Sequence, residues 1–420
     1  MPRARLCAFR VLERVHEGGY ASDLLLREAA HLDRRDAGLA SEIVFGCLRR
    51  QAQLDWLIDT QLNKRKLDPE VRIAMRIGAY QLLHLDRVPA HAAVSESVQL
   101  VKKARKTSAS GLVNAVLRKL VQGNADPWPS RSIQLSMPEW LLDRWDAQFG
   151  TEVADAIAKD FLKQPATWVR NPPDNVKGVE LEPSPDVSGA WRLVRGDAGG
   201  LRIQDIGSQS IVPLLDLRPG LTFLDLCSAP GNKTAQAMEA GVTAVACDLH
   251  LHRLKHSVVS ECPQVVLDAR APLPFRSYFD RILVDAPCTG TGTLGRNPEI
   301  RWRLRPEDVV DLQSRQVAIL TQALALLKPH DGVLVYSTCS LEREENEDVV
   351  AAVLASDPEV TLVKSMRRTP GVDPGDGFYA AVLMRLPHHQ AEPAQTANVA
   401  STPGTPNLEV PAAAAIIAPN

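Results

Sequence analysis

Two cysteines stand in short polar loops that directly follow apolar runs of the sequence. Cys288 lies in DAPCTGTG (285–292) after the run RILV, and Cys339 lies in VYSTCS (335–340). A turn seldom needs a cysteine, whereas a thiolate is a strong nucleophile, so both loops are candidates for covalent chemistry. If the two runs are neighbouring parallel strands, the thiols meet at one edge of the sheet. The stretch LEREENEDVVAAVLA after Cys339 is predicted to be helical, and a helix amino terminus nearby would lower a thiol pKa.

Acidic residues end the apolar runs of this part of the chain. Asp225 follows LTFL, Asp248 ends TAVACD and Asp268 ends QVVLD. A single strand-end aspartate is equally well explained as a helix cap. Three in successive runs favour a nucleoside, with Asp225 meeting an ammonium or ribose hydroxyl, Asp248 both ribose hydroxyls and Asp268 an adenine amino hydrogen. The loop DLCSAPGNKT (225–234) lets a ligand approach the backbone, and it is not a phosphate loop because GxxxxGK[ST] is absent.

A thiolate, a carboxylate and a nucleoside-linked cofactor together suit methyl transfer to carbon 5 of cytosine. That carbon attacks an alkyl sulfonium only after a thiolate has added to C6 while N3 is hydrogen-bonded or protonated. Afterwards the C5 proton must leave and the thiolate must be expelled. Cys339, Asp285 and Cys288 could supply the nucleophile, the acid near N3 and the group that assists release. Four further cysteines are assigned to hydrophobic packing, namely Cys7, Cys47, Cys247 and Cys262.

The elements that must position these loops follow from the pattern of apolar residues. In 203–386, short apolar runs alternate with segments long enough for helices, which predicts an α/β doubly wound, Rossmann-like parallel sheet. The last run (378–386) follows without an intervening helix and could pair antiparallel. Residues 1–125 show helical spacing and predict an all-α bundle. Residues 126–202 predict a small α/β connecting domain, and 387–420, with no Lys or Arg, a disordered tail.

Composition limits the class of protein. A chain of 420 residues suggests two or three domains, and its longest apolar stretches fall short of the roughly 20 residues that span a bilayer. Seven cysteines without a CxxC pair argue against a zinc site and a disulfide framework, which favours a reducing cytoplasm and no bound metal. Residues 1–120 hold 21 Lys and Arg against 13 Asp and Glu, whereas the remaining 300 hold 27 against 37. The basic part suggests a polyanion such as nucleic acid, with NKRK (63–66) and KKARK (102–106) either contacting it or merely solvating a surface.

The chemical motifs resemble those of the S-adenosylmethionine-dependent RNA cytosine-5 methyltransferases that carry two motif cysteines. The resemblance rests on DLCSAPGNKT, DAPCTGTGTLGRNPEIRW, YSTCS followed by EEN, and GDGFYAAVLMR. It implies that Cys339 is the nucleophile, that Cys288 promotes product release and that the cofactor is S-adenosyl-L-methionine. The implied cofactor-binding residues are Asp225, Cys227, Ser228, Ala229, Pro230, Gly231, Asn232, Lys233, Asp248, Arg253, Asp268 and Asp285.

The amino-terminal part is similar to the NusB-like helical domain of bacterial 16S ribosomal RNA methyltransferases of the RsmB (Fmu/Sun) type. RIGAYQLLHLDRVPAHAAVSESVQL and GLVNAVLRKL carry this likeness. It implies methylation of 16S ribosomal RNA before full subunit assembly, by a monomer in the cytoplasm. This sequence departs from the family's motifs at two places. Asn232 stands where the family has a second glycine, and IQDIGSQS (203–210) differs from the family's usual motif.

Three questions stay open at the level of the sequence. The substrate could instead be transfer RNA, or the chain could be a non-catalytic RNA-binding factor with a vestigial second domain. Retention of both cysteines and of the strand-end acids argues against the latter. In RNPEIRW (296–302), Arg296, Arg301 and Trp302 could lie near the target base or could serve the surface alone.

Overall fold

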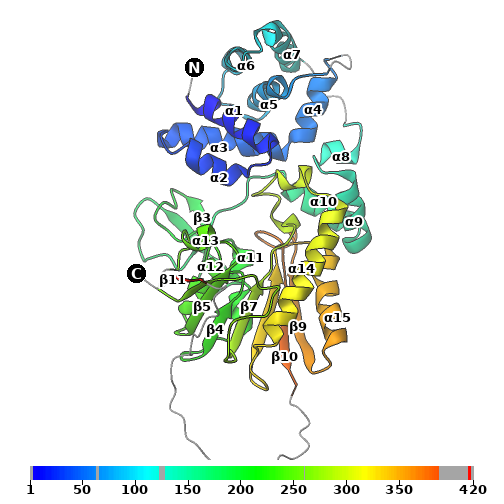
Figure 1. The fold of residues 1–420 in the computed structure, drawn as a ribbon. Helices are drawn as coiled ribbons and strands as arrows, with labels where there is room; N and C mark the ends of the chain where they lie inside the picture. Colours follow the sequence, from blue (N-terminus) through cyan, green and yellow to red (C-terminus); the bar gives the residue numbers. More distant parts are fainter. Residues whose placement is uncertain (1–2, 63–65, 123–127, 260, 387–414, 418–420) are drawn as a thin grey trace, which may run out of the picture. The chain divides into compact units, whose positions relative to one another are not determined.

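The structure is a computed structural model that describes residues 3–62, 66–122, 128–259, 261–386 and 415–417. The chain divides into two compact units, Met1–Pro165 with Thr293–Arg303, and Ala166–Gly292 with Leu304–Asn420. The first unit is helical, and the second contains two sheets (Figure 1). No helix among the described residues is both long and apolar enough to cross a membrane.

The first unit is built from amphipathic helices around one apolar core. In α5, the residues Ile73, Ile77 and Tyr80 recur at helical spacing, and all three are buried. Asp33 caps α3 by accepting a hydrogen bond from the Asp36 amide at 2.8 Å. The helices are α1 (Arg3–His16), α2 (Ala21–Glu28), α3 (Arg34–Arg49), α4 (Gln51–Asp59), α5 (Pro69–His84), α6 (Ala90–Lys103), η1 (Thr107–Ala109), α7 (Ser110–Gln122), α8 (Arg131–Gln134), α9 (Glu139–Phe149), α10 (Thr151–Asp160) and η4 (Ile300–Trp302).

The segment predicted as a connecting domain (126–202) contributes to both units. Its helices α8 to α10 belong to the first unit, and residues 123–127, where the sequence predicts a boundary, lie outside the described residues. The remainder forms a three-stranded antiparallel sheet in the order β1-β3-β2 within the second unit. These strands are β1 (Trp168–Arg170), β2 (Glu180–Pro183) and β3 (Ala190–Arg195).

The larger sheet of the second unit has the order β11-β6-β5-β4-β7-β8-β10-β9. The strands β6, β5, β4, β7 and β8 are parallel, and β10 pairs antiparallel with β8, which confirms the predicted doubly wound sheet and its antiparallel final run. The chain order reverses at β4, between β5 and β7, and ligands bind at such a switch point beyond the carboxyl ends of the strands. The strands are β4 (Thr222–Asp225), β5 (Thr243–Asp248), β6 (Gln264–Val266), β7 (Arg281–Asp285), β8 (Val333–Thr338), β9 (Val360–Arg368), β10 (Phe378–Arg385) and β11 (Ala415–Ile417).

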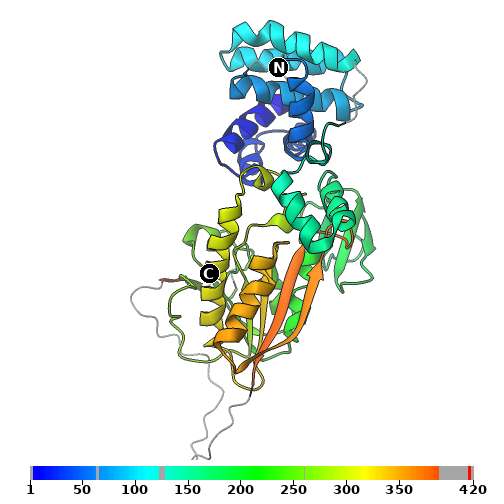
Figure 2. The same ribbon diagram turned by 90° about the vertical axis from the view of Figure 1, so that its right-hand side faces the viewer.

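Helices cover both faces of this sheet because successive strand residues point to opposite sides. Leu224 and Ile282 face α14 and α15, whereas Phe223 and Leu283 face the side of α12 and η2 (Figures 1 and 2). The remaining elements are α11 (Ile206–Gln209), η2 (Val212–Leu215), α12 (Asn232–Met238), α13 (Leu251–Leu254), η3 (Thr291–Thr293), α14 (Pro306–Leu324), η5 (Arg343–Glu345) and α15 (Glu347–Ser356).

Two elements of the sheet were not expected from the sequence. Strand β9 pairs antiparallel with β10 and forms one edge. In the range predicted to be disordered (387–420), residues 415–417 form β11, which pairs antiparallel with β6. The rest of that range lies outside the described residues.

Candidate active site

The two loop cysteines meet at the carboxyl ends of β7 and β8. These strands pair in parallel with Asp285 opposite Ser337, so the loops that follow them leave the sheet side by side. The sulfur atoms of Cys288 and Cys339 lie 3.4 Å apart, and both side chains are half-buried. The structure therefore brings together the two thiols that the sequence placed at neighbouring strand ends, while their catalytic roles stay predictions.

Glycine lets these loops approach so closely. The Gly292 amide donates a hydrogen bond to the Cys339 carbonyl at 2.9 Å. A Cβ atom on Gly292 would lie 2.4 Å from the Gly377 carbonyl oxygen and 2.8 Å from that of Cys339. No side chain fits there without moving backbone, so Gly292 is required where the loops touch.

An ion pair lies beside the thiols. Lys233, on the first turn of α12, donates from Nζ to Asp285 Oδ2 at 2.6 Å, and Ser337 donates to Asp285 Oδ1 at 2.8 Å. Burial acts to lower the pKa of the Lys233 ammonium, but the charge of Asp285 and its hydrogen bond, together with Cys339 and Asp225, outweigh burial and raise that pKa. Lys233, predicted as a cofactor-binding residue, is thus a buried cation next to both Asp285 and Cys339.

A buried carboxylate that the sequence did not single out lies behind the thiols. Glu345 is fully buried, and its side chain accepts hydrogen bonds from residues of both cysteine loops. Its only signal in the sequence is the EEN stretch after YSTCS, which enters as part of the family resemblance. Burial raises the pKa of this carboxyl, and hydrogen bonds from Ser340 and Thr289 act in the opposite direction.

These surroundings raise the pKa of the Cys288 thiol. Its hydrogen bond with Cys339 is the largest cause that raises its pKa, followed by burial and by the charges of Cys339 and Glu345. Of the described cysteines outside the loops, Cys7, Cys47, Cys247 and Cys262 are buried, as expected for residues that fill a core.

The predicted cofactor loop (225–233) connects β4 to α12. The Asp225 carboxylate accepts hydrogen bonds from Thr234 at 2.7 Å and from the Cys227 amide at 3.3 Å. Burial raises the pKa of Asp225 to about 7. The Asp225 carboxylate thus helps to organise this loop, and its predicted contact with the cofactor stays a prediction.

The departure at Asn232 does not distort the loop. Gly231 has φ +99°, and a Cβ atom there would lie 2.3 Å from Ser257 Oγ, so the left-handed position is filled by glycine. Asn232 follows as the first residue of α12 and is not among the residues with positive φ. A second glycine is therefore not needed.

The other predicted nucleoside contacts lie where their strands end. Asp248 accepts from the His250 amide at 2.9 Å and pairs with Arg253 at 3.3 Å, and Arg253 also donates to the Ala229 carbonyl at 2.6 Å. Arg253 thus ties the end of β5 to the loop after β4. Asp268 lies two residues beyond β6 and is paired with Arg270 at 2.6 Å, which lowers the pKa of Asp268.

The structure argues against Arg301 as a contact to a target base, whereas the placement of the half-buried Arg296 and Trp302 near the base stays a prediction. Arg301 is 1% exposed, and its guanidinium donates to the carbonyls of Ser136 at 3.1 Å and Leu294 at 2.8 Å. The Trp302 indole donates to the Leu48 carbonyl at 3.1 Å. Both Arg301 and Trp302 lie in Thr293–Arg303, the segment that belongs to the helical unit although it is distant from that unit in the sequence. Their side chains satisfy backbone carbonyls of that unit.

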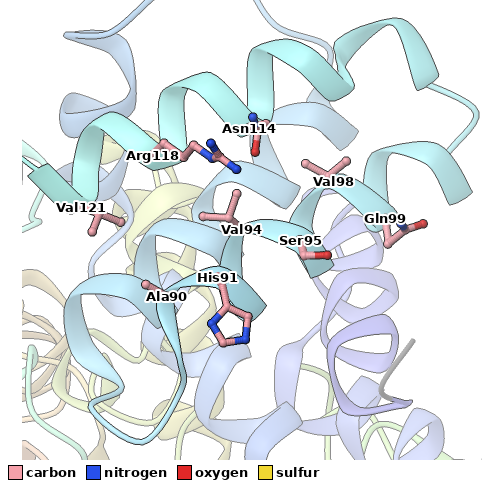
Figure 3. A pocket seen from close by; sticks show the side chains of 9 residues that line it. All are labelled: Ala90, His91, Val94, Ser95, Val98, Gln99, Asn114, Arg118 and Val121. Atoms are coloured by element: carbon pink, nitrogen blue, oxygen red, sulfur yellow. The ribbon is translucent and has the colours of Figure 1, made fainter.

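The helical unit has a groove of its own. It encloses about 490 Å³ between α6 and α7, and His91, Gln99, Asn114 and Arg118 are among the side chains at its walls (Figure 3). This groove contains neither cysteine nor carboxylate, so it is unrelated to the thiol pair. Among the described residues, no group of three or more His, Cys, Asp and Glu side chains is arranged to hold a metal ion.

Comparison with known proteins gives one consistent family. Residues 212–398 match the family model described as 16S rRNA methyltransferase RsmB/F, and residues 2–122 match the NusB family. The chain is 32% identical to ribosomal RNA small subunit methyltransferase B of Erwinia tasmaniensis over 92% of this chain and 99% of that protein. It is 30% identical to the probable ribosomal RNA small subunit methyltransferase B of Bacillus subtilis over 84% of this chain and 88% of that protein. Among solved structures, the crystal structure of PH0851 is similar in fold, with a TM-score of 0.77, 23% identity and coverage of 92% of this chain and 99% of that chain.

Proposed function

Because this chain belongs to the RsmB/F family of 16S ribosomal RNA methyltransferases, we propose that it methylates carbon 5 of a cytidine through a covalent bond between Cys339 and C6 of the base. The observation that carries the proposal is the 3.4 Å approach of the Cys288 and Cys339 sulfurs beside the Lys233–Asp285 ion pair. The cytidine would belong to 16S ribosomal RNA, and the enzyme would act in the cytoplasm, where thiols stay reduced.

The residues around β4 and β5 fit the cofactor S-adenosyl-L-methionine. The Ser228 hydroxyl is buried and has no hydrogen-bond partner within the described chain, so it can bond to a ligand at this loop. Asp248 ends β5 next to it, in the position that suits ribose hydroxyls. When bound, this cofactor supplies a methyl group on a positively charged sulfur.

The ion pair matches the edge of a cytosine. That edge presents an amino donor at N4 next to an acceptor at N3, and Asp285 beside Lys233 offers an acceptor next to a donor. The Lys233 ammonium also interacts electrostatically with Cys339, so in the proposed reaction this cation would stand beside the attacking sulfur. The same cation would thus activate the nucleophile and hold the base.

The reaction then proceeds in balanced steps on the base. The Cys339 sulfur bonds to C6, the electron pair of the C5–C6 double bond moves to C5, and N3 takes up a hydrogen bond or proton. The bound cofactor would supply its methyl group to C5, with the methyl–sulfonium bond breaking and the sulfur left as a neutral thioether, and a base would then remove the C5 proton. The electron pair of the broken C5–H bond re-forms the C5–C6 double bond. The C6–sulfur bond then breaks, and Cys339 leaves as a thiolate. A hydrogen bond from the Cys288 thiol stabilises that leaving thiolate.

The experiment is incubation of undermethylated 16S ribosomal RNA with labelled S-adenosylmethionine and wild type, Cys339→Ala or Cys288→Ala protein. We expect labelled 5-methylcytidine from wild type, no product from Cys339→Ala, and a covalent protein–RNA complex from Cys288→Ala. Labelling of transfer RNA alone would select the alternative substrate. Normal turnover by Cys339→Ala would contradict the covalent mechanism.

Phosphate contacts are expected from the basic side of the helical unit. Lys102 and Lys103 at the end of α6 are exposed, as is Arg118 in the groove of Figure 3, whereas Lys106 is paired with Asp68 at 2.8 Å. Of NKRK, residues 63–65 lie outside the described residues. Substituting Lys102, Lys103 and Arg118 together by Gln should weaken RNA binding and reduce its salt slope by about one counterion for each cation that is removed. Unchanged affinity and slope would remove these residues from the interface.

A further inference from the structure

The residue that follows each loop cysteine carries a hydroxyl, and both hydroxyls donate to one carboxylate. Thr289, after Cys288, and Ser340, after Cys339, each hydrogen-bond to the same oxygen, Oε2 of Glu345. The two hydroxyl oxygens lie 3.1 Å apart. Glu345 therefore connects the two loops one residue away from each sulfur.

The second oxygen of Glu345 holds the same loops from another side. Oε1 accepts the Thr289 amide at 2.8 Å and the Gln316 side-chain amide at 3.0 Å. Gln316, on α14, also donates to the Pro287 carbonyl at 2.9 Å. The carboxylate is thus tied to the residues on both sides of Cys288.

The hydrogen-bond donors and acceptors in this network are consistent with an ionised Glu345 carboxylate. Ser340 Oγ already accepts the Glu342 amide at 3.0 Å, and Thr291 Oγ1 accepts the Leu341 amide at 2.9 Å. The hydroxyl proton of Ser340 is therefore available for Glu345. The carboxylate has four donors, all of them neutral, so its negative charge is not cancelled by a hydrogen-bonded cation among the described residues.

The two sulfurs consequently have different charged neighbours. The pKa of Cys288 is raised by its hydrogen bond with Cys339, by burial and by the charges of Cys339 and Glu345, whereas Cys339 interacts electrostatically with the Lys233 ammonium. Two thiols only 3.4 Å apart would otherwise compete for one negative charge.

We propose that Glu345 is a positioning residue that fixes the spacing of the two cysteine loops and keeps Cys288 protonated, so that Cys339 alone becomes the nucleophile. This inference rests on the proposed function and adds how two adjacent thiols acquire different roles. A protonated Cys288 can donate its hydrogen to the Cys339 sulfur when the C6–sulfur bond breaks. A Cys288 thiolate could not, and it would repel the departing thiolate.

The test follows the alkylation of Cys288 by iodoacetamide across pH, in full-length Cys339→Ser protein without RNA or cofactor, with the label located by mass spectrometry. Adding Glu345→Gln keeps the size and one acceptor oxygen, replaces the other oxygen by an NH2 donor, and removes the charge. We expect the midpoint for Cys288 to fall by about 1 pH unit or more. Glu344→Gln, the same change one residue earlier on η5, serves as the matched control and should leave the midpoint in place.

A second variant separates charge from position. Ser340→Ala removes one donor to the carboxylate and leaves its charge, so in the Cys339→Ser background the Cys288 midpoint should change little. In protein that retains Cys339, where kcat is measured, the same substitution should lower kcat and leave KM for RNA the same. Glu345→Gln should lower kcat about 10-fold or more, since a thiolate at Cys288 opposes release. An unchanged or higher midpoint in folded Glu345→Gln protein would overturn the proposal. Because alkylation needs no methyl transfer, this outcome is independent of whether cytosine is the substrate.

Discussion

The motif DAPCTGTGTLGRNPEIRW reads as one stretch in the sequence, yet its two halves use their polar side chains in opposite ways. In 285–292, the Cys288 sulfur contacts the Cys339 sulfur, and the Asp285 carboxylate accepts from the Lys233 ammonium. These groups lie at the strand ends, where a ligand could reach them. In 293–303, the buried Arg301 is occupied by backbone carbonyls. A motif that accompanies an activity can therefore contain residues that serve only to hold the chain in place.

The same comparison shows how RNA binding by the helical unit should be tested. Residues 293–303 are anchored within that unit, where Arg303 donates to the Gly18 carbonyl at 2.9 Å and Arg49 to that of Gly295 at 2.9 Å. Deleting residues 1–122 would remove these partners. Substitutions on the basic surface are therefore a cleaner test of RNA binding than deletion.

The largest effect expected from this comparison is at Arg301. Arg301→Met leaves buried carbonyls without donors, so we expect the free energy of unfolding to fall by about 3–5 kcal/mol. Chemical denaturation measures this change, and RNA affinity of the folded fraction should keep its salt slope. If Arg301→Met had normal stability but had lost RNA affinity, Arg301 would contact RNA and would not serve the fold alone.

A somewhat smaller effect is expected at Lys233. Lys233→Met removes the partner of Asp285 and the cation beside Cys339, so kcat should fall about 100-fold, or roughly 3 kcal/mol of transition-state stabilisation. Lys328→Met is the matched control, because Lys328 pairs with Asp280 at 2.7 Å at the beginning of β7, away from the thiols. Equal losses in the two variants, measured by single-turnover methylation, would mean that Lys233 serves stability alone.

The pH dependence of stability tests whether Asp225, a predicted cofactor contact, is a buried residue that stabilises the fold. Its pKa of about 7 lies above that of an exposed aspartate, so it stabilises the folded state fully below about pH 4, and this contribution is lost as pH rises through 7. Relative to Asp225→Asn, wild type should lose stability of roughly 3 kcal/mol or more between pH 4 and pH 8. Thermal unfolding at several pH values measures the difference. A wild type that gains stability relative to the variant over this range would show that Asp225 is ionised and ion-paired in the fold.

The smallest effect is expected at Asn232. Asn232→Gly restores the family's second glycine, but this residue is helical, so stability should change by no more than about 0.5 kcal/mol. Gly231→Ala, one residue earlier, should be clearly destabilising because Gly231 has positive φ and Ser257 leaves no room for a Cβ atom. Similar melting temperatures for the two variants would show that the loop tolerates either backbone.

The sequence predicted those features that are local in the chain. Apolar runs ending in Asp located β4, β5 and β7, and the parallel order then brought Cys288 next to Cys339. Glu345 could not be found in this way because its donors come from three separated segments and converge only in the fold. The burial of Arg301 could not be predicted from the sequence either. A basic residue in a polar stretch gives the same sequence pattern whether its side chain faces solvent or a backbone carbonyl.

The central claim is that Cys339 forms the bond to the base and that Cys288 is needed to break it. It is tested most directly by isolating the complex that Cys288→Ala forms with RNA and S-adenosylmethionine, digesting it and locating the attached nucleotide by mass spectrometry. The account predicts a methylated cytidine on the peptide that contains Cys339. A nucleotide on any other residue, or no covalent complex while methylation continues, would contradict it.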